Sequence, residues 1–302
     1  MMELAGGDEG QLLLGGDQPA TVASIGAATL PRRVVEEARH AERARKLGMP
    51  AEVMDPAAVA ALEPDLTLNA IGGVYYRLDS HVTPERFHAA LSRLVRQRGG
   101  MFEWGAELRD WKREGRAVRA AVTSRGEIEA DEFLVAAGSW SSRLVRPLGL
   151  NPPLQPGKGY SLTLTAPPQR PRRAVLLQES RVALTPMGRA LRVGGTLELG
   201  AFDGRISPPR VRGILRSLSR HLPAFHPENF NGTSAWCGHR PCTPDGLPYV
   251  GSFEQFENLS VATGHAMMGL SMAPITGKLV AELLSGEPPS IDISALRPDR
   301  YR

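Results

Sequence analysis

The chain has 302 residues, a formal net charge of +4 and only four lysines among its 36 basic residues. This length suffices for one large domain or two modest domains with a hydrophobic core. The arginines are scattered along the chain, so the positive charge does not predict a nucleic-acid-binding surface. No run of residues reaches the ~18 to 20 apolar positions that a membrane-spanning helix needs, and we expect no transmembrane segment.

The cysteine pattern argues against a structural metal site. Cys237 and Cys242 flank His239, but no second Cys/His pair stands at a zinc-binding spacing. Structural zinc ordinarily takes four protein ligands, so we predict buried free thiols and no metal. The first ten residues carry acidic side chains and no basic one, unlike a signal peptide. Together these features favour a cytoplasmic protein.

Helical periodicity dominates the first hundred residues. It predicts a helix over 32–47, a short helix over 55–62 and, after a strand at 72–76, a third helix. Thr83 and Pro84 suit the N-cap and first position of this third helix. Its apolar stripe comprises Phe87, Leu91, Leu94 and Val95.

Strand patterns become more frequent further along the chain. We expect a strand at 101–104, a β-meander over 106–129 and a strand buried on both faces at 133–137. Ser141 can cap a following helix, and residues 159–199 are rich in strand signals. The last part of the chain predicts a helix over 208–222, a strand over 259–263 and, after a glycine turn, a helix that runs through Leu284.

The segment Gly264–Ser271 is a candidate ligand-binding turn between a buried strand and a helix. A helix N-terminus presents free N–H groups and the positive end of the helix dipole, so it can stabilise an anion. The negative charge of a reduced flavin is one such anion. A plain strand–helix turn is the alternative, and the residues alone do not separate the two.

The segment Trp236–Pro248 contains three prolines and two glycines, which predict a stiff, irregular loop around Arg240. An arginine in this setting can bind a carboxylate through two parallel hydrogen bonds. The alternative is a structural arginine that binds loop carbonyls. The small residues that end the strand at 133–137 would likewise let a ligand approach the backbone.

Several motifs occur together in one order: Pro156–Ser161, Thr185–Gly188 with Arg192–Gly195, Trp236–Gly251 and Gly264–Gly277. As a set they resemble the D-amino-acid oxidase superfamily of FAD-dependent oxidoreductases, closest to its D-amino-acid dehydrogenase branch. The resemblance covers the chain from about Arg32 onward.

The resemblance implies that FAD is the cofactor and that a small amino acid is oxidised by hydride transfer from Cα to flavin N5. Arg240 would bind the substrate carboxylate, and the electron acceptor would be a quinone or oxygen. The residues that the resemblance assigns to the cofactor are Leu108, Gly138, Trp140, Gly264, His265, Met268, Gly269, Leu270 and Ser271.

Two departures from the family pattern stand out. The chain contains no G-x-G-x-x-G motif, which in the family opens the chain and holds the FAD diphosphate. We therefore expect a truncated chain, one part of a split enzyme or an incorrectly assigned start, with weak FAD binding or none. The carboxylate-binding tyrosine of relatives is also absent from 182–184, and Tyr160 is the nearest candidate to replace it.

The resulting fold prediction is α/β. An incomplete, Rossmann-like FAD-binding domain would comprise 80–150 and 236–302, and an α+β substrate domain with a mainly antiparallel sheet would comprise 1–79 and 151–235. The strands around Val135 and Val261 should then lie in one sheet. Alternative functions are a non-catalytic remnant that cannot hold FAD, or oxidation of a secondary amine such as sarcosine or hydroxyproline.

Overall fold

The computed structural model describes residues 22–200 and 202–301, which form two compact units. The first unit comprises residues up to 101 together with 160–196 and 205–237. The second comprises 102–159, 197–204 and 238 onward. Three of the five crossings between the units, at 159/160, 196/197 and 237/238, fall within strands of the largest sheet, and both units are discontinuous in sequence.

Fourteen strands form three sheets in the described part of the chain. The eight-stranded sheet has the order β12-β8-β11-β10-β9-β1-β3-β2, and the two three-stranded sheets have the orders β13-β14-β7 and β4-β5-β6. The strands are β1 (Val22–Ala28), β2 (Ala51–Met54), β3 (Gly72–Ser80), β4 (Leu108–Glu114), β5 (Ala117–Thr123), β6 (Gly126–Glu129), β7 (Phe133–Val135), β8 (Gln155–Leu164), β9 (Ala174–Leu177), β10 (Val182–Met187), β11 (Ala190–Leu199), β12 (Trp236–Cys242), β13 (Tyr249–Ser252) and β14 (Leu259–Thr263).

The helices agree closely with the periodicity of the sequence. The α-helices are α2 (Pro31–Lys46), α3 (Pro56–Leu62), α4 (Pro84–Gln97), α5 (Ser141–Val145), α6 (Pro208–His221) and α7 (Gly269–Leu284). Short 3-10 helices are η2 (Gly138–Trp140), η3 (Arg146–Leu148), η4 (Pro227–Phe230) and η5 (Ser294–Leu296). Four of the six α-helices, α2, α3, α4 and α6, carry proline in the first turn, where its missing N–H costs no hydrogen bond.

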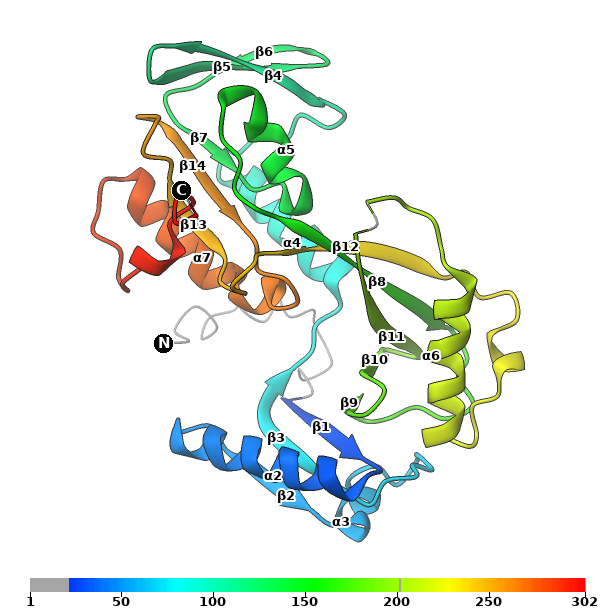
Figure 1. The fold of residues 1–302 in the computed structure, drawn as a ribbon. Coiled ribbons are helices and arrows are strands. Elements are labelled where there is room, and N and C mark those ends of the chain that lie inside the picture. Colours follow the sequence, from blue (N-terminus) through cyan, green and yellow to red (C-terminus); the bar gives the residue numbers. More distant parts are fainter. Residues whose placement is uncertain (1–21, 201, 302) are drawn as a thin grey trace. The chain divides into compact units, whose positions relative to one another are not determined.

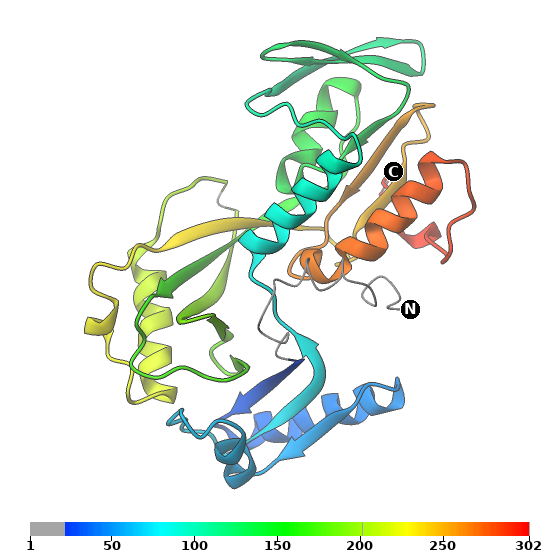
Figure 2. The same cartoon turned by 180° about the vertical axis from the view of Figure 1, so that it is seen from behind.

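The first unit is built on a mainly antiparallel arrangement of strands. β1 pairs antiparallel with β3 and parallel with β9, and β10 pairs antiparallel with both β9 and β11. Helix α6 buries Ile214 and Leu218 in the core that the sheet's apolar residues form. Figures 1 and 2 show α6 beside this sheet and α2 along the end formed by β1, β3 and β2.

The second unit contains a small sheet in which β14 pairs parallel with β7 and antiparallel with β13. Val261 of β14 lies opposite Val135 of β7, which confirms that these two strands share a sheet. Helix α7 packs Leu279 and Val280 against Val250 of β13. The meander β4-β5-β6 is tied to the same unit by Trp111, whose indole N–H donates to the Leu144 carbonyl at 2.7 Å.

Some sequence-based expectations need correction. The expected strand at 101–104 is wrong: the segment forms a turn in which the rings of Phe102 and Trp104 stack at 5.3 Å. Strands β1 and β2 were not predicted, because both are short and depend on pairing with β3. Helix α4 falls in the first unit, whereas the sequence-based boundary at residue 80 assigns it to the cofactor domain; that domain assignment stays a prediction.

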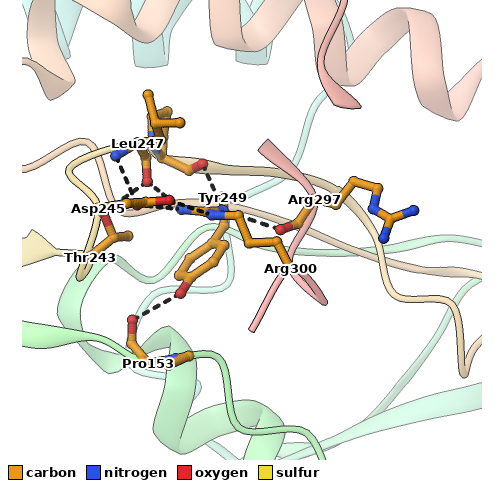
Figure 3. Close-up of polar contacts among 8 residues, drawn as sticks. Pro153, Thr243, Asp245, Leu247, Tyr249, Arg297 and Arg300 are labelled. Atoms are coloured by element: carbon orange, nitrogen blue, oxygen red, sulfur yellow. Dashed lines mark hydrogen bonds and ion pairs between the residues drawn. The ribbon is translucent and has the colours of Figure 1, made fainter. Parts of the chain in front are cut away.

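The loop between β12 and β13 is held in place by Arg300 (Figure 3). Its guanidinium group donates to both carboxylate oxygens of Asp245 at 2.8 and 2.9 Å, and to the carbonyls of Leu247, Pro248 and Arg297 at 2.7, 3.2 and 3.1 Å. The same group lies 4.1 Å from the ring centroid of Tyr249. All of these contacts use the planar fork of arginine, which lysine lacks.

The contacts of Arg300 with Asp245, the three carbonyls and Tyr249 form a clamp. Two residues of this clamp have shifted pKa values. Hydrogen bonding to Arg300 holds the pKa of Asp245 well below its usual range, while burial raises the pKa of Tyr249 to about 12. The Tyr249 hydroxyl donates to the Pro153 carbonyl at 3.1 Å. At neutral pH the Asp245–Arg300 pair is therefore fully charged and the tyrosine is a neutral donor.

We predict that Arg300→Lys lowers the free energy of unfolding by about 1 to 3 kcal/mol at pH 7, because an ammonium group cannot replace this set of hydrogen bonds. Urea denaturation measures the change. The depressed pKa of Asp245 means that the clamp stabilises the fold above the unfolded-state pKa, about 3.9, and is lost as the pH falls towards the lower folded-state pKa. The difference between variant and parent should therefore shrink below about pH 4.

Arg297→Lys is the matched control for this substitution. Arg297 is exposed and its side chain forms an ion pair with Glu254 at 3.3 Å, so its replacement should change stability by less than about 0.5 kcal/mol. Equal destabilisation by the two substitutions would show that the clamp contributes nothing beyond an ordinary surface arginine.

Candidate functional site

Arg240 lies on β12 with its guanidinium group against the backbone of β8. A Cβ atom added to Gly159 would lie 2.0 Å from Nη1 of Arg240, so the arginine occupies space that only glycine leaves open. Gly157, two residues earlier on β8, likewise leaves room for Cys242, whose Sγ would lie 3.0 Å from an added Cβ. Small residues at alternate positions of β8 thus clear one face of the strand for the side chains of β12.

The Arg240 guanidinium group is half-buried and incompletely satisfied. Its Nη1 atom is buried and has no hydrogen-bond partner among the described residues. Burial lowers the pKa of Arg240 from its ordinary value, with neighbouring Cys242 acting in the opposite direction, but an arginine side chain stays charged at neutral pH. A buried cationic donor without a partner is costly, and a carboxylate is the group that would satisfy it best.

The turn after β14 contains two residues with left-handed backbone conformation and packs closely against its neighbours. Gly264 has φ +86° and Ala266 has φ +48°, both in the left-handed region. A Cβ at Gly264 would lie 2.7 Å from Cγ2 of Thr243, so the turn packs tightly against the β12–β13 loop. The Ala266 amide donates to the Pro241 carbonyl at 2.9 Å, which joins the turn to β12 directly after Arg240.

Helix α7 begins at Gly269, and the Met268 side chain provides no cap hydrogen bond. The first-turn N–H groups of Gly269, Leu270 and Ser271 are therefore available to a ligand. His265 is oriented by a hydrogen bond between its Nε2 and the Thr276 hydroxyl at 2.9 Å, and burial lowers its pKa, so it is neutral at pH 7. Met268 and Leu270 are exposed and offer apolar surface at the helix start.

The segment that follows β7 lies beside the turn that follows β14. Gly138 has φ +54° and its carbonyl accepts a hydrogen bond from the Thr263 hydroxyl at 2.9 Å. The Trp140 ring is half-exposed and makes edge contacts with Phe202 and His239 at 5.0 and 5.8 Å between centroids. The structure thus brings Gly138, Trp140 and the Gly264–Ser271 turn into one region of the second unit.

Two other predicted site residues lie elsewhere. Leu108 is the first residue of β4, in the separate meander sheet. Tyr160 is 1% exposed and packs in the hydrophobic core of the first unit, an environment that favours a structural role. Their assignments to adenine and substrate binding stay predictions.

His239 and Phe202, whose rings contact Trp140, were not identified from the sequence. His239 precedes Arg240 on β12 and contacts Phe202 at 5.3 Å, and its Nε2 atom is buried without a partner among the described residues. Strand alternation could have indicated that His239 faces away from Arg240. The ring contact between His239 and Phe202 joins residues that are distant in sequence, so no local sequence pattern indicates it.

These residues fit a bound flavin. The uncapped start of α7 suits the anionic edge of a reduced isoalloxazine ring, and the exposed Met268 and Leu270 suit its apolar surface. The orphaned donor of Arg240 lies on β12, whose end is joined to the same turn. In the described part of the chain, no cluster of three or more His, Cys, Asp or Glu residues could hold a metal ion. No described helix is long and apolar enough to cross a membrane.

Curated relatives carry consistent names. The chain is 35% identical over 262 residues to the D-amino acid dehydrogenase of Bradyrhizobium diazoefficiens and 33% identical over 268 residues to that of Granulibacter bethesdensis. Each match covers 85% of this chain but 62% of the relative, so the chain spans less than two thirds of the length of these enzymes.

A solved structure and a family model agree with these relatives. The glycine oxidase from Geobacillus kaustophilus is 27% identical, with a TM-score of 0.84 over 93% of this chain and 75% of that chain. The family model described as DAO, FAD dependent oxidoreductase, matches residues 22–283. With 262 of 302 residues inside that match, the chain belongs to the DAO family of FAD-dependent oxidoreductases.

Proposed function

We propose that this chain carries the substrate-binding machinery and part of the flavin-binding machinery of a D-amino-acid dehydrogenase. The observation that carries the proposal is the buried Nη1 atom of Arg240, which lies against Gly159 without a partner among the described residues. The names of the curated relatives support the choice of a D-amino acid as substrate. The Nη1 group of Arg240, available to donate to a carboxylate, also argues against a non-catalytic remnant.

In this proposal Arg240 binds the substrate carboxylate through two parallel hydrogen bonds and thereby fixes the amino acid on the surface of β12. FAD, when bound, accepts the hydride that leaves the substrate Cα. His265 stays neutral and keeps the turn in shape through Thr276. Positioning of the substrate is then the main contribution of the protein, and no side-chain base is required.

The cofactor residues are proposed from the same geometry. The turn Gly264–Ser271 would meet the isoalloxazine ring, Gly138 and Trp140 would line the path of the dinucleotide, and the backbone of Leu108 would contact the adenine side. Tyr160 is a second candidate for the substrate carboxylate. The second unit would supply the cofactor domain and the first unit the substrate domain. We further propose a cytoplasmic protein that passes its electrons to a quinone or to oxygen.

We predict that Arg240→Lys reduces kcat/KM for D-alanine by about ten-fold or more, since the fork is worth at least ~1.4 kcal/mol. The assay is dye-coupled oxidation with saturating FAD. An amine without a carboxylate should be affected far less, because it never engages Arg240. Arg189→Lys, in the exposed turn between β10 and β11, is the control and should leave both rates unchanged. Equal losses for the amine and the amino acid would make Arg240 structural.

Gly159→Ala tests the same site from the opposite strand. The new methyl group would overlap Nη1 of Arg240, so the guanidinium group must move. We expect KM for the amino acid to rise about ten-fold through loss of carboxylate alignment, with fold stability only modestly reduced. The control is Gly213→Ala in α6, where no atom lies within 4 Å of the added Cβ. Unchanged KM in Gly159→Ala would remove Arg240 from the substrate site.

Flavin affinity provides a test that does not depend on activity. The sequence has no G-x-G-x-x-G loop for the FAD diphosphate, so the chain of residues 1–302 should contact mainly the ring. We predict weak binding, with FAD no more than about ten-fold tighter than FMN, a difference of ~1.4 kcal/mol. Quenching of flavin fluorescence measures both constants. Purified chain that carries one FAD per molecule would contradict this prediction.

A further inference from the structure

A cavity beside α5 has a charge pattern that the proposed function does not use. Arg143 of α5 and Arg146 of η3 both line this cavity, which has a volume of about 240 Å³. A second hollow of about 290 Å³ shares Arg146 and Ser142 with it, so the two are neighbours. The remaining residues around the first cavity are Ser139, Ser142, Leu154, Gln155, Pro156, Gly200 and Phe202.

The two arginines face the cavity without acidic neighbours. No aspartate or glutamate lines either hollow, and neither Arg143 nor Arg146 forms an ion pair with a carboxylate of the described ranges. Like charges three residues apart in a helical turn repel one another and destabilise it. Most other charged positions of this unit avoid that cost; Lys112 and Arg119, for example, pair with Glu127 and Glu114. An anion between Arg143 and Arg146 would turn the repulsion into attraction.

Arg143 is held in place for such a ligand. Its guanidinium carbon lies over the ring of Phe202, 3.8 Å from the ring centroid, which is a cation–π contact. This contact uses the face of the aromatic ring and not a hydrogen-bond acceptor, so it consumes none of the N–H donors of Arg143. Phe202 in turn packs on Trp140 and His239, so the ring that contacts Arg143 is held in place by two further aromatic side chains.

Neutral polar groups also line the cavity. The hydroxyl of Ser142 is nearly buried and donates to Oδ1 of Asn151, a residue of the second hollow, at 3.5 Å. Gln155 lines both hollows. Two guanidinium groups at one cavity match a ligand group that has several acceptor oxygens and more than one negative charge.

We propose that the cavity bounded by Arg143, Arg146 and Gln155 binds a phosphate group. The phosphate belongs either to a separate small molecule or to the diphosphate of FAD, and we propose a separate molecule because Arg240 and the Gly264–Ser271 turn are absent from the lining of both hollows. Ser139, which lines the first hollow, stands between Gly138 and Trp140 of the proposed dinucleotide path, so competition with ADP is the deciding measurement. The proposal does not depend on the substrate of the enzyme.

The test is titration of the purified chain with inorganic phosphate at constant ionic strength, followed by isothermal calorimetry or ³¹P NMR line broadening. Arg143→Ala and Arg146→Ala should each weaken phosphate binding about ten-fold, and the double variant should abolish it, because each removes charge-assisted hydrogen bonds. Arg146→Lys should be intermediate, since it keeps the charge and loses the fork. Arg125→Ala, in the exposed turn between β5 and β6, is the matched control and should bind like the parent.

Circular dichroism checks that the variants fold, which the exposure of both arginines leads us to expect. Phosphate affinity equal in the parent and in the double variant would overturn the proposal. Competition between ADP and phosphate would also overturn it, because the cavity would then belong to the cofactor. Phosphate binding that ADP does not displace and that the arginine variants lose supports a separate site. Flavin affinity is measured independently, so failure here leaves the proposed function standing.

Discussion

The guanidinium group of Arg300 ties the loop between β12 and β13 to the C-terminal part of the chain. It donates to Asp245 and to the carbonyls of Leu247 and Pro248, and it adds to the hydrogen bonds that the loop makes within itself, from the Thr243 hydroxyl to the Leu247 carbonyl and from the Leu247 amide to Asp245. Thr243 within that loop then packs against Gly264, and Arg240 lies just before it. The candidate substrate-binding arginine and the candidate flavin-binding turn therefore have a common support from the C-terminal part of the chain.

The regular elements were predictable where the local pattern and the tertiary environment agree. Strand Leu259–Thr263 is almost entirely buried, and the helix after it ends at Leu284 as its periodicity indicates. The segment 101–104 failed because two large aromatic residues suggested a strand, whereas their rings stack on one another in a turn. Strand propensity describes how a side chain fits a pleated surface, and this segment has no partner strand among the described residues.

The site was predictable only in part, for a related reason. Arg240 and the glycine turn stand in motifs whose stiffness and backbone requirements are visible in sequence. The Trp140–Phe202–His239 cluster is not visible, because it joins three segments that are far apart in the sequence and no local spacing encodes that contact. Tyr160 shows the opposite case: its motif is conspicuous, yet its ring is buried in a core. A motif specifies which residues recur, and the fold decides where each side chain points.

The alternation of glycine along β8 has a consequence for how such an enzyme can diverge. At Gly159 the space for a side chain is filled by Arg240, and at Gly157 it is filled by Leu197 and Cys242, so a larger residue at either position must displace a neighbour. Sequence change that preserves the position of Arg240 must then occur at other residues while these two stay glycine. This face of β8 is set by its neighbouring strands, and variation among relatives is easier on strands that do not carry such close contacts.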